Sequence, residues 1–156
     1  MEKGNTTLKA SDFLEYIYFF IKDEAVYEYL LERSVANKIS ITYEEIRKTF
    51  GFKHCSQVGN IIRRLQLYGL IEKLSAKNSR GLYYIYDLPE KKPSYIISQM
   101  SGDKIKDLNY AKISEKFQIS KTYAKFLVQQ IKAKATFLTR AALKKQEQSV
   151  RIRRFI

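Results

Sequence analysis

Four polar side chains on one predicted helix are suited to binding nucleic acid by hydrogen bonding. They are Gln57, Asn60, Arg63 and Arg64. Apolar residues recur at helical spacing through the same segment, which leaves these four on the opposite face. Arginine pairs with guanine, and asparagine or glutamine with adenine, in the DNA major groove. This chemistry is recognition without bond making. The alternative is an ordinary solvated helix face.

Two short helices separated by a tight turn are predicted to position this face. Thr42 is a natural N-cap for the first helix, and acidic residues follow it where the helix dipole favours negative charge. Gly51 is expected to end that helix, and Phe52 to fill the corner. The second helix is expected to open at Cys55 or Ser56.

A β-hairpin is predicted after the second helix. Gly69 stops the helix, and residues 70–74 are suited to a strand. Residues 77–81 have turn chemistry, and residues 82–88 are rich in Tyr and Ile, which favours a second strand. The hairpin tip is basic, and its candidate nucleic-acid contacts are Lys77, Asn78 and Arg80.

Helix, turn, helix and a hairpin with a basic tip resemble the winged helix-turn-helix domains. The resemblance covers about residues 23–88, and the family's L..YGLIE passage from recognition helix to wing is matched from Leu65 to Glu72. It implies that the second helix enters the major groove of double-stranded DNA. It also implies phosphate contacts at Lys53 and His54 in the turn, and adds Ser56 to the DNA-facing residues.

The helix-turn-helix pattern returns 67 positions later in the chain. Thr42 then corresponds to Asn109, so the two N-caps coincide, and so do the apolar positions of the first helix. With a turn that is one residue shorter, the apolar positions of the second helix coincide too. The departure is Gln118, where a glycine is commoner at such a turn. A second recognition-type helix is expected over residues 120–134. Its exposed candidates for DNA contact are Lys121, Thr122, Tyr123 and Lys125.

The expected fold is mainly α with small β-hairpin wings, an α+β protein with tandem winged helices. The expected divisions are a leader with an extra aromatic helix (1–22), a first winged helix (23–88), a linker (89–93) and a second winged helix or helix-turn-helix domain (94–156). For the second wing, strands over 137–140 and 150–156 compete with a helix over 141–148. The aromatic segment either covers one side of the first domain or forms a homodimer.

Charge points to a polyanionic partner. The chain of 156 residues carries a formal net charge of +13. Residues 1–34 contribute four basic and seven acidic side chains, a balance of −3, so residues 35–156 carry +16. The basic character therefore belongs to the part that contains the two helix-turn-helix patterns. Nucleic acid is the first expectation, and an anionic membrane surface the second.

No residues support an enzyme, a metal site or a cofactor. One cysteine and one histidine cannot form a zinc site, and no phosphate loop, paired carboxylates or catalytic triad is apparent. The apolar run near the N-terminus is too short to span a membrane, and no signal-peptide pattern is present. A cytoplasmic, nucleoid-associated or a nuclear location is therefore expected rather than secretion.

The function expected from these features is sequence-specific binding of double-stranded DNA. The resemblance implies a transcriptional regulator or a plasmid- or virus-type replication or partition protein. The main alternative is a tandem winged-helix scaffold that binds other proteins in a larger complex, because a fold does not fix a function. An RNA-binding basic protein would fit the charge but not the duplicated major-groove helix.

Overall fold

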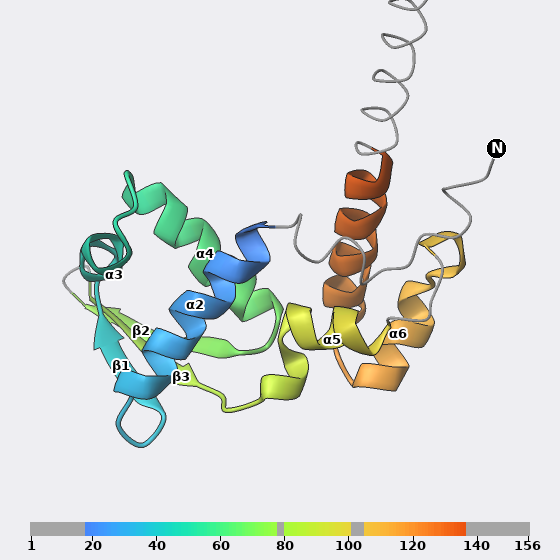
Figure 1. The fold of residues 1–156 in the computed structure, drawn as a ribbon. Helices are drawn as coiled ribbons and strands as arrows, with labels where there is room; N and C mark the ends of the chain where they lie inside the picture. The colour runs from blue at the N-terminus through green and yellow to red at the C-terminus, as the bar shows by residue number, and fades with distance from the viewer. Residues whose placement is uncertain (1–17, 78–79, 101–104, 137–156) are drawn as a thin grey trace, which may run out of the picture.

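The computed structural model describes residues 18–77, 80–100 and 105–136. This part is mostly helical with one three-stranded antiparallel sheet of order β1-β3-β2, which confirms the expected α+β character. The sheet lies at one end with α2, α3 and α4, and α5 and α6 lie toward the other (Figure 1). The elements are α2 (Tyr18–Arg33), β1 (Lys38–Ile41), α3 (Tyr43–Phe50), α4 (Cys55–Leu67), β2 (Ile71–Lys77), β3 (Arg80–Ile85), the 3-10 turns η2 (Pro89–Lys91) and η3 (Ile105–Asp107), α5 (Pro93–Gln99), α6 (Tyr110–Phe117) and a last helix described over residues 121–136.

Helix α2 is continuous through Asp23, where the sequence led us to expect a new helix to begin. That expectation was wrong because Asp23 is not an N-terminal acid; it lies on the buried face of α2 with Phe20, Tyr27 and Leu30. Partners on α4 satisfy its carboxylate, so the helix continues past it. Residues 18–22 of the expected aromatic helix belong to α2, and the part of that helix before residue 18 lies outside the described residues.

The first predicted pair of helices is confirmed as α3 and α4. Thr42 Oγ1 accepts a hydrogen bond from the Glu45 N–H (3.1 Å), and the Glu45 carboxylate accepts one from the Thr42 N–H (2.8 Å). This reciprocal capping box satisfies two free donors at the start of α3. Gly51 ends α3 in the left-handed conformation (φ 71°), and α4 opens at Cys55.

The second pair of helices repeats this local geometry. Asn109 Oδ1 accepts a hydrogen bond from the Ala111 N–H (2.9 Å) at the start of α6. Gln118 ends α6 in the left-handed conformation (φ 53°), which costs a residue with a Cβ about 1 kcal/mol. The Ser114 hydroxyl donates to the Ile119 carbonyl (2.6 Å) and fastens that turn. Ser120 Oγ then accepts from the Tyr123 N–H (3.1 Å) and caps the last helix.

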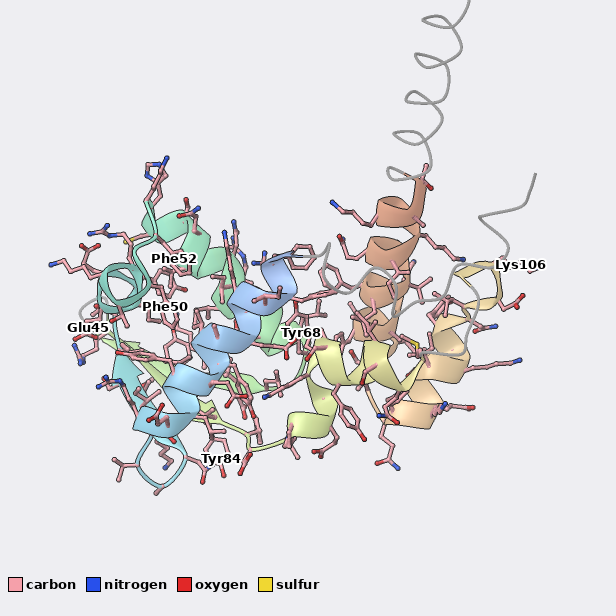
Figure 2. All side chains as sticks on the ribbon, in the orientation of Figure 1. Glu45, Phe50, Phe52, Tyr68, Tyr84 and Lys106 are labelled. Carbon is pink, nitrogen blue, oxygen red and sulfur yellow. The ribbon has the colours of Figure 1, made fainter. Side chains whose placement is uncertain are left out.

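The predicted hairpin is confirmed as β2 and β3, and a third strand, β1, was not predicted. Its residues pair with β3, with Lys38 opposite Tyr84 and Ile41 opposite Gly81. Alternation along β3 buries Tyr83 against the helices and leaves Tyr84 on the outer face, where Figure 2 labels it. The segments expected to form a second wing, 137–140 and 150–156, lie outside the described residues.

One contiguous apolar core runs through both halves of the described structure. The rings of Tyr68, at the end of α4, and Tyr123, in the last helix, lie 4.8 Å apart between centroids. Phe126 of the last helix also contacts Phe20 of α2, with 6.2 Å between centroids. Figure 2 places Tyr68 at the centre of the molecule, where the two halves meet. The helix pairs are therefore packed against each other.

Candidate nucleic-acid interface

The outer face of α4 is exposed as the sequence predicted. Ser56, Gln57, Asn60 and Arg63 are exposed, while the apolar residues of the helix are buried. Helix α4 contains two arginines and no acidic residue. One Nη2 proton of Arg63 is donated to Asn60 Oδ1, a pair at i and i+3 on the surface. Asn60 and Arg63 thus form one polar unit directed at solvent.

Gln57 is exposed and also forms hydrogen bonds within the protein. Its Oε1 accepts hydrogen bonds from the backbone N–H groups of Lys53 (3.0 Å) and His54 (3.3 Å). These bonds hold the turn before α4 against the first turn of that helix. A carbonyl oxygen has two acceptor sites, so a bidentate contact of Gln57 with adenine would displace one of these bonds.

Arg64 does not lie on the outer face, and its assignment to that face was wrong. Its Nε and Nη2 donate to the two carboxylate oxygens of Asp23, at 2.8 and 2.9 Å. Its side chain is 25% exposed, and that of Asp23 is 0% exposed. The guanidinium also lies 5.0 Å from the centroid of the Phe19 ring. Arg64 therefore joins α4 to α2 and leaves Arg63 as the outward-facing arginine of α4.

Burial governs the electrostatics around Asp23. Desolvation raises the pKa of the Asp23 carboxyl, and hydrogen bonds from Arg64 and Tyr68 offset only part of this rise. The Tyr68 hydroxyl donates to Asp23 Oδ2 at 2.6 Å, and burial raises the pKa of Tyr68. A signal for this site was present in the sequence, since Asp23 falls in the apolar stripe of α2 at helical spacing. No pattern in the sequence indicated that its partner is Arg64, which lies 41 positions away.

The turn before α4 presents one lysine and one histidine, and it lies beside a carboxylate of α3. Lys53 and His54 are exposed, as expected for phosphate contacts. The Cys55 thiol donates to Glu44 Oε2 (3.2 Å), and that contact raises the pKa of Cys55. Hydrogen bonds from Arg47 lower the pKa of Glu44 to about 2. The start of α4, next to Lys53, therefore borders the Glu44 carboxylate.

Arg80 is bound within the protein at the base of the hairpin tip. It donates to Glu45 Oε1 (3.0 Å), to the Ser40 hydroxyl (3.1 Å) and to the Ser40 carbonyl (3.1 Å). The carboxylate that caps α3 thus also holds β3. Lys77 lies in β2 with its side chain outside the described part, and Asn78 lies outside the described residues.

The last helix presents lysines and no acidic residue over residues 121–136. Lys121, Thr122 and Lys125 are exposed as predicted. Tyr123 was predicted to be exposed and is buried (0%), because its ring packs on Tyr68 and its hydroxyl donates to the Lys91 carbonyl at 2.6 Å. Gln129 and Lys132 continue this exposed face.

Within residues 18–77, 80–100 and 105–136, no cluster of three His, Cys, Asp or Glu side chains is arranged to hold a metal ion. In the same part of the chain, no helix combines the length and the apolar composition that crossing a membrane requires.

Among the described residues, the candidate interface therefore consists of an amide and a guanidinium on α4, Lys53 and His54 in the turn before it, and lysines along the last helix. No family model matches the chain, and neither a curated protein nor a solved structure matches it.

Proposed function

We propose that the chain is a tandem winged helix-turn-helix protein that binds double-stranded DNA. In this proposal α4 enters the major groove, Asn60 and Arg63 contact base edges, and Lys53 contacts the backbone. The single observation that carries the proposal is the outer face of α4. It holds an exposed amide and an exposed guanidinium on a helix without acidic residues.

The order of elements around α4 supports the proposal. Helix α2, strand β1, helices α3 and α4 and the hairpin of β2 and β3 follow one another in the order of a winged helix. Helix α6 and the helix over 121–136 repeat the capped turn, with Gln118 in the left-handed conformation of Gly51. The second wing of the proposal would lie in residues 137–156.

The mechanism is occupancy of a DNA site, which blocks or recruits other machinery. This action fits a transcriptional regulator and a replication or partition protein alike. A protein-binding scaffold would require no basic recognition helix. Because Arg64 and Arg80 are bound to Asp23 and Glu45, the distinction from a scaffold rests on Arg63 and on the lysines.

The proposal is tested by titrating the full chain into a labelled duplex of random sequence, about 24 base pairs long, over a range of salt concentrations. We expect the logarithm of the association constant to fall linearly with the logarithm of the salt concentration, with a slope of about 0.9 per phosphate contact. A duplex RNA of equal length should bind more weakly, because its major groove is too narrow for a helix. Failure to bind the DNA duplex at about 50 mM salt would exclude the proposed function.

A further inference from the structure

We infer that α4 and the last helix bind one duplex together, as a single rigid surface whose contacts fall within about one turn of DNA. Two of the exposed lysines of the last helix, Lys125 and Lys132, would hold phosphates beside the segment that α4 contacts. This inference rests on the proposed function and adds the length and continuity of the DNA site. It depends on how the two halves are joined.

The segment between the halves is bound to α2 rather than free. The Tyr27 hydroxyl donates to the Tyr86 carbonyl and accepts from the Leu88 N–H (3.2 Å). The Glu24 carboxylate accepts hydrogen bonds from the Ser94 N–H (3.1 Å) and from the Ser94 hydroxyl. Because backbone groups on both sides of η2 are held by one helix, this segment does not act as a flexible linker.

The same junction continues into the last helix. The Tyr123 hydroxyl donates to the Lys91 carbonyl (2.6 Å), and the Tyr123 ring packs against Tyr68 at the end of α4, tilted by 32°. Phe19 at the start of α2 lies 6.0 Å from Phe126, measured between ring centroids. Figure 1 shows the N-terminal end of α2 (blue) between α4 (green) and the last helix (orange to red). Because close-packed interior side chains hold neighbouring helices in a fixed relative position, the two helices move as one body.

The junction also limits the distance between the two contact surfaces. Arg63 precedes Tyr68 by five residues, and Lys132 follows Tyr123 by nine. With a rise of about 1.5 Å per residue and about 10 Å between packed helices, the backbone positions of Arg63 and Lys132 are separated by about 30 to 35 Å at most. One turn of B-DNA is about 34 to 36 Å long. Both surfaces are therefore close enough to contact the same turn.

The chemistry of the two surfaces differs. The α4 surface offers an amide and a guanidinium, which can distinguish bases. The last helix offers exposed Lys125 and Lys132, and ammonium groups act on phosphates as point charges without reading sequence. The last helix is thus suited to adding salt-dependent affinity to a site that α4 selects.

The test compares duplexes of about 12 and about 24 base pairs, one and two turns long. The full chain is compared with a Lys125→Ala/Lys132→Ala double variant. The control is a Lys38→Ala/Lys106→Ala variant, which removes equal charge from two exposed lysines on β1 and η3. Binding is measured against salt, and urea unfolding checks that each variant folds.

We expect the Lys125→Ala/Lys132→Ala variant to flatten the salt dependence by about two units already on the shorter duplex, and the control to leave it unchanged. A slope unchanged on both duplexes would show that the last helix stays off the DNA. A slope changed only on the longer duplex would show that it reaches beyond one turn. Either result overturns the inference while α4 binding stands, whereas absence of all binding overturns the proposed function itself.

Discussion

Arg64 and Asp23 join α4 to α2 by two parallel hydrogen bonds, Nε to Oδ2 at 2.8 Å and Nη2 to Oδ1 at 2.9 Å. The neighbouring Arg63 points away from this pair, toward Asn60 and solvent. Two adjacent arginines therefore have separate roles. Arg64 fixes where α4 lies, and Arg63 is the residue that α4 presents to a partner.

Replacing Arg63 should weaken duplex binding without weakening the fold. We expect Arg63→Ala to reduce affinity at least about tenfold, because one good bidentate base contact contributes about 1 to 3 kcal/mol. Arg33→Ala is the matched control, since Arg33 is an exposed arginine at the end of α2 whose guanidinium lies over Tyr29. Anisotropy titrations measure both variants. Equal losses for the two would mean that only net charge matters.

Replacing Arg64 should weaken the fold. We expect Arg64→Ala to lower the free energy of unfolding by about 3 kcal/mol at neutral pH, because the buried Asp23 carboxylate loses its cation. Urea unfolding measures this loss, with Arg63→Ala as the control. A loss below about 0.5 kcal/mol, the size ordinary for surface substitutions, would contradict the structural role of the pair.

The cost of Arg64→Ala should also depend on pH. Burial raises the pKa of Asp23, and removing Arg64 removes a group that lowers it. An acid whose pKa is raised by folding stabilises the fold fully below its unfolded pKa and loses that contribution as pH rises through the folded pKa. The variant should therefore approach the wild type in stability as the pH is lowered toward about 4. An equal difference at neutral and acid pH would contradict this account.

The two N-caps should contribute similar amounts to the free energy of unfolding. Thr42→Ala and Asn109→Ala each remove a side-chain acceptor from the first turn of a helix, which typically costs about 1 kcal/mol. Urea unfolding of the two single variants and of the double variant measures this. Because the caps lie in different halves, we expect the costs to add to within about 0.5 kcal/mol. A negligible effect at Asn109 would contradict the repeat of the turn geometry.

The Tyr123 hydroxyl should contribute to holding the halves together. Tyr123→Phe keeps the ring on Tyr68 but leaves the Lys91 carbonyl without this donor, and we expect a loss of about 1 kcal/mol. Tyr95→Phe is the control, since Tyr95 is 42% exposed. Chemical unfolding compares the variants. Equal stability of the two would mean that the hydroxyl contact is dispensable.

Acid should weaken the start of α3. Hydrogen bonds from Arg47 and Cys55 lower the pKa of Glu44 from its ordinary value of 4.5 to about 2. The contribution of Glu44 is therefore present above about pH 4.5 and is lost as the pH falls toward about 2. The midpoint of urea unfolding of Glu44→Gln should be below that of the wild type at about pH 6 and should converge with it near pH 2. The control is Glu115→Gln, at an exposed glutamate. If the unfolding midpoint converged with that of the wild type at low pH for Glu115→Gln but not for Glu44→Gln, the stabilising role of Glu44 would be contradicted.

Local patterns in the sequence were sufficient for much of the fold. Thr42, Gly51 and Asn109 were identified because caps and left-handed turns depend on a few neighbouring residues. Strand β1 was missed because four residues carry a weak pattern, and because its position depends on pairing with β3, whose partner residues lie 40 to 46 positions later. The continuation of α2 through Asp23 was missed because the partner that stabilises the buried carboxylate lies on another helix.

The candidate site was predictable only in part. Periodicity correctly placed Asn60 and Arg63 on the exposed face of α4, since the opposite face is apolar. It could not separate Arg63 from Arg64, because Arg64 lies at the margin between the two faces and its direction is decided by Asp23. The predicted exposure of Tyr123 was wrong for a related reason, since its burial follows from contact between the two halves. Periodicity within one helix carries no information about such a contact.

The central claim, that α4 selects bases and the last helix does not, is tested most directly by selecting bound sequences from random duplex DNA. Full-chain wild type, Asn60→Ala and Lys125→Ala are compared in parallel. We predict one enriched sequence for the wild type, the same sequence for Lys125→Ala, and a sequence relaxed at about one position for Asn60→Ala. No enrichment by the wild type, or an identical sequence from Asn60→Ala, would contradict the account.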